Sequence, residues 1–194
     1  MPEAPAALPA DCWQRLFGND HPLGIEVGPG RGEFLCAIAG ARPNWNFYAI
    51  ERSASRTAHV SRALAERGLG NARVVWADAT CLLPLLPAGT AAALYVQFPD
   101  PWWKRRHFRR RIWTPELARS MAHVLAPEAE IEFLTDVDET FALGVAQLDA
   151  APELERVSVG EVARHDTDFA RKALRRGARL YRAAYRRRAP EVPG

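Results

Sequence analysis

The chain has 194 residues, of which 48% are hydrophobic and 25% charged, with a formal net charge of +3. This length suits one compact α/β domain with a sizeable core and is too short for two large domains. No apolar run approaches the roughly 20 residues that cross a bilayer, which argues against a membrane protein. The first ten residues lack the basic start and apolar stretch of a secretory signal, so we expect a cytoplasmic protein.

Apolar runs of strand length alternate with segments of helical length, which is typical of βαβ units and a parallel sheet. The expected strands are residues 23–27, 47–50, 73–76, 92–97 and 131–134. The expected helices are 33–39, 53–67, 115–125 and 138–148, and Ser or Thr precedes the second and third as a suitable N-cap.

The C-terminal part of the chain predicts a strand at 155–159, a helix at 168–176 and a last strand at 177–185. A final antiparallel hairpin would complete a seven-stranded, mostly parallel sheet with helices on both faces. We expect residues 1–20 to form a partly flexible lead and residues 21–194 to form a single domain, as a monomer or homodimer.

Neither disulfides nor a metal site are expected. The three cysteines are odd in number and scattered without CxxC spacing, and the five histidines show no metal-ligand spacing. Cations are concentrated at residues 104–111 and 171–188, and the sequence pI is about 9.0. Such clusters are typical of a protein that binds nucleic-acid phosphates, and they also occur as merely solvated faces.

The first expected strand runs into Glu-Val-Gly-Pro-Gly-Arg-Gly at residues 26–32, and a helix follows. Gly28 and Gly30 permit a tight turn and the close approach of a ligand to bare backbone. The third glycine comes two residues after the second rather than three, which favours a mononucleoside ligand over a dinucleotide. Glu26, at the strand end, can reach the charged amine of a methionine-like tail.

Acidic residues also follow the next two strands. Glu51 stands about twenty residues beyond the glycine turn, where a carboxylate can accept both hydroxyls of a ribose. Asp78, with small neighbours that include Ala79, would suit an adenine slot and would equally serve as a helix cap. Because open α/β sheets bind ligands at the carboxyl ends of their strands, these acids predict an anionic rim. S-adenosylmethionine fits that rim best, since its amine and sulfonium are cationic.

The fourth expected strand leads into Phe-Pro-Asp-Pro-Trp-Trp-Lys-Arg-Arg-His at residues 98–107. The flanking prolines hold Asp100 in an extended segment, from which its carboxylate reaches the same rim. Trp102 can stack on a base, and the cations that include Arg106 can hold phosphates, whereas a rigid turn with core tryptophans is the structural alternative. Asp136 ends the fifth strand and serves either a substrate amine or a helix cap.

Across residues 24–182 the chain resembles the bacterial tRNA (guanine-N7)-methyltransferases, which use S-adenosylmethionine to methylate a variable-loop guanosine of tRNA. The Phe-Pro-Asp-Pro-Trp segment with its following cations is the most specific part of the resemblance. It implies a Rossmann-like class I methyltransferase fold. It also implies donor contacts from Glu26, Glu51, Asp78 and Asp100, a catalytic role for Asp100, and substrate contacts from Lys104 and Asp136.

The late Thr-x-Phe-Glu element of the family is similar to Thr167-Asp168-Phe169, which implies substrate contacts there, but Ala170 stands where the family has glutamate. Trp103 stands where the family usually has proline. A divergent or non-catalytic RNA-binding relative, and a methyltransferase with another substrate, therefore stay open. A nicotinamide oxidoreductase ranks last, because the glycine spacing does not match and no catalytic Tyr-Lys or His arrangement is evident.

Overall fold

The computed structural model describes residues 7–101, 112–158 and 168–189. Its strands form one seven-stranded sheet in the order β3-β2-β1-β4-β5-β7-β6. β7 pairs antiparallel with both of its neighbours, and the other pairs are parallel, which confirms the expected architecture. The strands are β1 (Leu23–Val27), β2 (Asn46–Glu51), β3 (Ala72–Trp76), β4 (Ala91–Gln97), β5 (Leu125–Thr135), β6 (Leu154–Val157) and β7 (Tyr181–Arg187).

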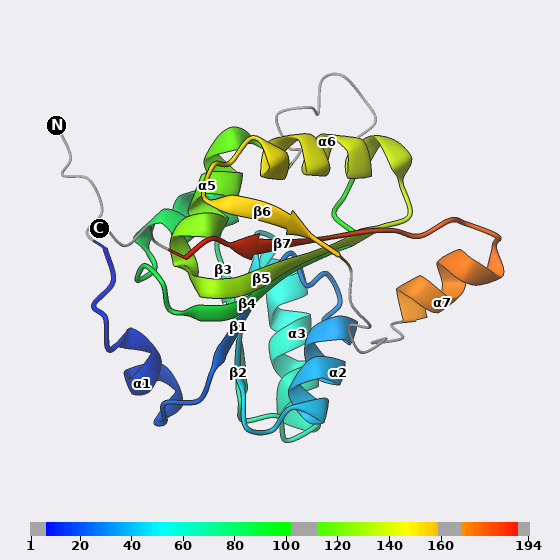
Figure 1. Cartoon of the computed structure of the whole chain (residues 1–194). Coiled ribbons are helices and arrows are strands. Elements are labelled where there is room, and N and C mark those ends of the chain that lie inside the picture. Colours follow the sequence, from blue (N-terminus) through cyan, green and yellow to red (C-terminus); the bar gives the residue numbers. More distant parts are fainter. Residues whose placement is uncertain (1–6, 102–111, 159–167, 190–194) are drawn as a thin grey trace, which may run out of the picture.

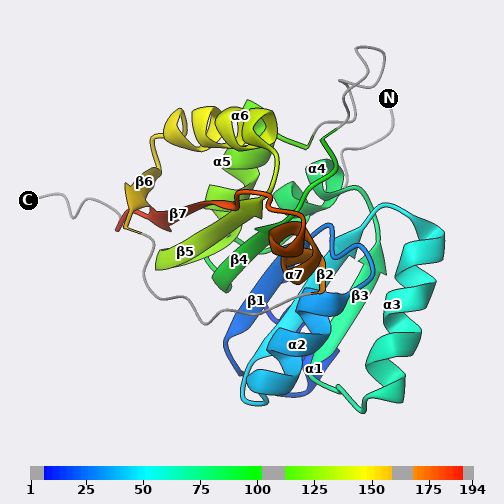
Figure 2. The same ribbon diagram turned by 90° about the vertical axis from the view of Figure 1, so that its right-hand side faces the viewer.

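Helices cover both faces of this sheet (Figures 1 and 2). On one face lie α2 (Glu33–Ala41) and α3 (Ala54–Glu66), with α7 (Asp168–Arg175) beside α2. The other face carries α4 (Ala79–Leu82), α5 (Pro115–Val124) and α6 (Asp138–Asp149), as Figure 2 shows. Two apolar clusters result, one on each side of the sheet.

The alternation of side chains along β1 divides the core. Ile25 and Val27 belong to the cluster under α5, whereas Glu26 points to the opposite face because successive strand residues face opposite ways. α6 approaches its face closely at Gly144, where an added Cβ would lie 2.4 Å from the Phe133 ring. Only glycine fits at that contact.

Side-chain caps start the two helices for which the sequence predicts them. The Ser53 hydroxyl accepts from the N–H of Arg56 at the start of α3, and the Thr114 hydroxyl accepts from the N–H of Leu117 at the start of α5. Each cap satisfies a backbone donor that the first turn of a helix leaves without a partner.

Several boundaries differ from the expectation. The last strand begins at Tyr181 and runs to Arg187, so residues 177–180 lie outside it, and β6 ends at Val157. α5 ends at Val124 and β5 starts at once with Leu125. The sequence predicts neither α4 nor α1 (Cys12–Phe17).

Aromatic side chains attach α1 to the sheet, and Phe17 of this helix lies under the Arg73 guanidinium at 5.6 Å from its ring centroid. The Trp13 indole N–H donates to the Thr90 hydroxyl at 3.0 Å, and the Trp13 ring meets the Tyr48 ring edge-on at a centroid distance of 5.0 Å. The described part of the lead therefore packs on the core. Among the described residues, none of the helices is both long and apolar enough to cross a membrane.

The strand order determines where a ligand site can form. β1 and β4 are neighbours, while the chain after β1 winds toward β2 and β3 and the chain after β4 winds toward β5. Between β1 and β4 the winding direction changes, and open α/β sheets bind ligands outside the carboxyl ends of the strands at such a point. The glycine turn follows β1 there, and the segment with Asp100 follows β4.

Candidate active site

The glycine turn between β1 and α2 depends on backbone conformations that favour glycine. Gly28, Gly30 and Gly32 have φ angles of 75°, 59° and 78°. The Gly28 N–H donates to the Ile50 carbonyl at 2.9 Å, which ties the turn to the end of β2. Side chains at Gly28 and Gly30 would meet nothing within 4 Å. The turn therefore exposes bare backbone at the carboxyl edge of the sheet.

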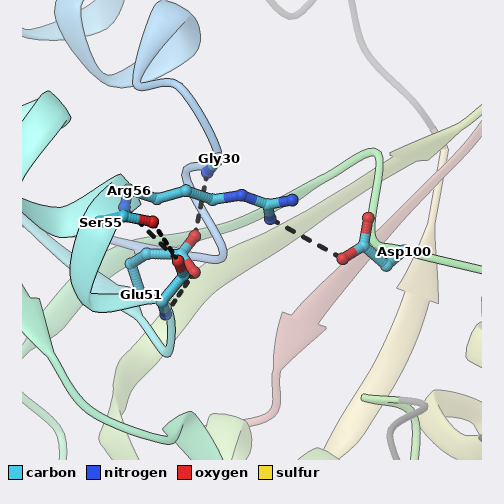
Figure 3. Close-up of polar contacts among 6 residues, drawn as sticks. Gly30, Glu51, Ser55, Arg56 and Asp100 are labelled. Atoms are coloured by element: carbon cyan, nitrogen blue, oxygen red, sulfur yellow. Dashed lines mark hydrogen bonds and ion pairs between the residues drawn. The ribbon is translucent and has the colours of Figure 1, made fainter.

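Glu51 joins the glycine turn to the start of α3 (Figure 3). One carboxylate oxygen accepts from the N–H of Ser53 at 2.8 Å, and the other accepts from the N–H of Gly30 at 3.3 Å. The residue is only 2% exposed. Two backbone donors thus hold this buried carboxylate at the end of β2, with both of its oxygens engaged.

Glu26 is equally buried, at 2% exposure, but it lacks such support. Its Oε2 has no hydrogen-bond partner among the described residues. Burial, and secondarily the charge of Glu51, raises the pKa of Glu26 to about 8. Among the described residues this buried carboxyl group therefore has no cationic partner, and a positively charged group nearby would favour its ionised form.

Asp78 lies at the end of β3 and caps α4. Its Oδ1 accepts from both the N–H and the hydroxyl of Thr80, at 2.9 and 2.7 Å. Both hydrogen bonds go to the same oxygen, and Ala79 behind it is buried. These hydrogen bonds support the role of Asp78 as a helix cap, which the sequence offers beside a contact with adenine.

Asp100 follows β4 and carries an exposed carboxylate. Its Oδ2 lies 3.7 Å from a guanidinium nitrogen of Arg56, in an ion pair whose side chains are 56% and 50% exposed (Figure 3). Arg56 lies in the first turn of α3, shortly after Glu51 in the chain. Arg56 is not predicted from the sequence, because local patterns do not pair residues that follow two different strands.

The segment that carries Asp100 leaves the sheet through a constrained residue. Phe98 has a φ angle of 49°, in the left-handed region that a bulky residue rarely adopts, and its N–H donates to the Leu134 carbonyl at 2.8 Å. One residue earlier, Gln97 donates to Glu132 Oε1 at 3.3 Å, and Arg182 reaches the same oxygen at 3.4 Å. Side chains of three adjacent strands thereby fix the end of β4.

The remaining predicted site residues divide into two groups. Asp136 is half-buried directly after β5, so it lies at the same edge of the sheet as the other acids. Trp102, Lys104, Arg106 and Thr167 lie outside the described residues, and so does the side chain of Phe169, whose backbone belongs to α7.

Two further findings delimit the site. Within the described ranges, no cluster of three or more His, Cys, Asp or Glu side chains could hold a metal ion. A hollow of about 600 Å³ lies between α2 and α3, next to the end of the glycine turn. It is lined by residues that include Arg31, Cys36, Arg67 and Arg171, and none of the predicted rim acids lines it.

The arrangement as a whole is an anionic edge of a parallel sheet. Two buried carboxyl groups lie at the ends of β1 and β2, and three further acids follow β3, β4 and β5. Backbone N–H groups of a glycine turn lie between them. Such an edge can hold a cationic ligand with free hydroxyl groups, and it can offer a carboxylate to a second molecule at Asp100.

Comparisons with known proteins agree with this geometry. A family model described as "Putative methyltransferase" matches residues 20–183. A tRNA (guanine-N(7)-)-methyltransferase of Rhodopirellula baltica is 37% identical over 201 residues, which cover 96% of this chain and 74% of the relative. A tRNA (guanine-N(7)-)-methyltransferase of Alkalilimnicola ehrlichii is 35% identical, covering 98% of this chain and 81% of the relative.

Solved structures share the fold at lower identity. The aminoglycoside resistance methyltransferase NpmB1 superposes with a TM-score of 0.66 at 20% identity, covering 93% of this chain and 94% of that chain. A variant of the 16S rRNA (adenine(1408)-N(1))-methyltransferase from Catenulisporales acidiphilia, with its cosubstrate SAM, gives 0.64 at 18% identity, covering 97% and 96%. By its family match and by relatives that align over nearly the whole of this chain, the chain belongs to the tRNA (guanine-N(7)-)-methyltransferase family.

Proposed function

We propose that this protein binds S-adenosylmethionine at the anionic edge and transfers its methyl group to N7 of a guanosine in tRNA. The expected acceptor is the guanosine of the variable loop, and the expected place of action is the cytoplasm. Membership of the family supports the reaction, and the geometry of the acids supports the residue roles given below.

The buried acids fit the donor in two different ways. Glu26 has an oxygen without a partner and a raised pKa, so the ammonium of the donor's methionine part would supply the cation that this carboxyl group lacks. Glu51 is held by Gly30 and Ser53, and each carboxylate oxygen has a second lone pair for a ribose hydroxyl. When bound, the donor supplies an electrophilic methyl group on a sulfonium.

The neighbouring residues complete the donor site. Gly28 and Gly30 would let the ligand approach their backbone, because side chains there are absent and open space surrounds them. Asp78 would accept from the exocyclic amine of adenine through Oδ2, since its Oδ1 caps α4. Ala79 would leave room for the ring.

On the acceptor side we assign the RNA contacts by family resemblance. These residues are Lys104, Asp136, Thr167 and Phe169, with Trp102 as a stacking platform and Arg106 as a phosphate contact. An aromatic platform would offset the stacking that a guanine loses when it leaves folded tRNA.

The chemistry requires alignment rather than proton removal. Guanine N7 carries a lone pair and no proton, so attack on the methyl group needs no general base and depends on positioning. Methylation leaves a cationic guanine. The Asp100 carboxylate would match that developing charge better than it matches the neutral base, and it would therefore stabilise the transition state selectively.

One observation carries the proposal: buried Glu26 with its unpartnered oxygen lies next to Glu51, whose carboxylate is fixed on the glycine turn. The decisive experiment incubates unmodified tRNA with the protein and S-adenosylmethionine and then identifies the nucleosides by mass spectrometry. We expect 7-methylguanosine, mapped to the variable loop by nuclease fragments. Methylation of another base, or of protein, would overturn the proposal.

Calorimetry with S-adenosylmethionine separates the non-catalytic alternative, which Ala170 and Trp103 motivate. A relative that only binds RNA would bind tRNA and would give no heat with the donor. An active enzyme binds both.

A further inference from the structure

We propose that Arg56 controls access to Asp100: it pairs with the Asp100 carboxylate when RNA is absent and moves to a tRNA phosphate when the substrate binds. Asp100 then becomes available to the reacting methyl group and guanine. This inference rests on the function proposed above and gives Arg56 the role of a positioning residue.

The topology shows that the ion pair crosses the site. Arg56 belongs to α3, which follows β2, whereas Asp100 follows β4. Because β1 lies between β2 and β4 in the sheet, the pair spans the carboxyl end of β1, where the glycine turn begins. Figure 3 shows the Arg56 side chain extended from α3 toward Asp100, with Glu51 and Gly30 near the base of the same helix.

The charges make this arrangement unfavourable for the donor. A guanidinium that contacts Asp100 lies near the place where the sulfonium must meet the acceptor, and two cations repel each other there. The same contact neutralises the carboxylate that is to stabilise the methylated guanine. For methyl transfer, Arg56 has to leave Asp100.

The strength of the contact suits a reversible change. Both side chains are about half exposed, and the closest nitrogen-oxygen distance is 3.7 Å, so water screens the attraction. The backbone N–H of Arg56 is bonded to the Ser53 cap, which fixes the start of the helix while the long side chain remains free to turn.

A tRNA phosphate is a stronger partner for this guanidinium than a single exposed carboxylate. Arginine binds phosphate oxygens in a bidentate fashion, and RNA surrounds each phosphate with further negative charge. Substrate binding would therefore draw Arg56 off Asp100, and donor and tRNA would bind cooperatively.

The test measures this cooperativity in binding, apart from catalysis. Sinefungin is the probe, because its amine places a fixed cation where the donor carries its methyl group and it transfers nothing. We expect unmodified tRNA to tighten sinefungin binding to the native protein about two- to fivefold, the factor typical of an exposed ion pair. In Arg56→Gln, sinefungin binds two- to fivefold more tightly without RNA, and tRNA adds no further gain.

Three controls make the result specific. Arg62→Gln removes the same charge from an exposed position of α3 and retains the native coupling. Arg56→Lys keeps the charge and should retain part of the coupling between sinefungin and tRNA. S-adenosylhomocysteine lacks the sulfonium charge, so Arg56→Gln should change its affinity less than it changes the affinity for sinefungin.

Two outcomes overturn the inference: native coupling in Arg56→Gln, or weaker sinefungin binding by that variant in the absence of RNA. The proposed function fails in a different way, because a native protein that methylates no tRNA contradicts the reaction itself. A native enzyme that forms 7-methylguanosine while Arg56→Gln keeps its coupling contradicts only the role of Arg56.

Discussion

The inner acids of the site, Glu26 and Glu51, differ from its outer acids, Asp78 and Asp100, in how the fold holds them. The inner pair is buried at the ends of adjacent strands, whereas Asp100 is exposed and pairs with the half-exposed cationic side chain of Arg56. The two inner acids also differ from each other: backbone donors bind both oxygens of Glu51, whereas Glu26 Oε2 has no partner in the described parts of the chain. The buried acids are therefore suited to binding a cationic ligand, and the exposed Asp100 can exchange one ion-pair partner for another.

The largest expected effect belongs to an outer acid. Asp100→Asn should lower the single-turnover rate of methyl transfer to tRNA about 300-fold, because it removes the charge that stabilises the cationic guanine. Donor affinity should stay within about threefold, as measured by calorimetry. Asp20→Asn is the matched control, since Asp20 precedes β1 at the opposite edge of the sheet. An unchanged rate for Asp100→Asn would assign catalysis to another residue.

Glu51→Gln should weaken donor binding about 50-fold and lower the free energy of unfolding by about 2 kcal/mol. An amide presents an NH2 group to one of the two backbone donors that now face a carboxylate oxygen, which leaves a buried donor without an acceptor. Calorimetry and urea unfolding measure the two effects. Glu66→Gln, on the exposed side of α3, serves as the control, and equal behaviour of both variants would contradict the role of Glu51.

Glu26→Gln should have the opposite effect on stability. The folded pKa of Glu26, about 8, lies above its ordinary value of 4.5, so its contribution to stability is complete below that ordinary value and is lost as the pH rises through 8. Relative to the native protein, the free energy of unfolding of the variant should be about 4 kcal/mol higher at pH 9 and unchanged at pH 4.5. Urea unfolding at both pH values measures this gain.

The same residue gives a binding signature. At pH 7 the free protein holds a proton on Glu26, and an ammonium bound beside it favours the ionised form, so donor binding should release close to one proton. Calorimetry in two buffers of different ionisation enthalpy counts that proton. If Glu26→Gln released as many protons on donor binding as the native protein does, Glu26 would not contact the donor's ammonium.

The smallest effect tests whether Asp78 is more than a helix cap. Asp78→Ser keeps a hydroxyl that caps α4, so the free energy of unfolding should change by less than about 0.5 kcal/mol. Donor affinity should fall about fivefold, because the second carboxylate oxygen is gone. Asp78→Ala should lose the same affinity and about 1 kcal/mol of stability besides. Native donor affinity in the serine variant would leave Asp78 with a structural role alone.

The sheet was predictable because its strands are short apolar runs bounded by turn residues. The first strand is predicted at its observed bounds, and Ser53 and Thr114 cap the helices for which they were expected. α4 has only four residues, too few for a helical period, and its cap Asp78 reads equally well as a ligand. The last strand was placed too early, because its sequence, Tyr-Arg-Ala-Ala-Tyr-Arg-Arg, lacks the apolar pattern of the others.

Within the site, the sequence indicates which residues follow strands and says little about their surroundings. Glu26 and Glu51 look alike in the chain, and only the fold brings two backbone donors to one of them. The contact between Arg56 and Asp100 joins segments separated by two strands and their helices. Such pairings depend on the order of strands in space, which local patterns do not contain.

Phe98 places backbone strain in the segment that carries Asp100. Its left-handed backbone turns the chain out of β4 within one residue and sets the direction in which Asp100 leaves the sheet. A bulky residue in that conformation costs on the order of 1 to 3 kcal/mol. Glycine would relieve this strain, but it would also remove the half-buried aromatic side chain and add backbone freedom to the unfolded chain, so the segment would hold the Asp100 carboxylate less firmly.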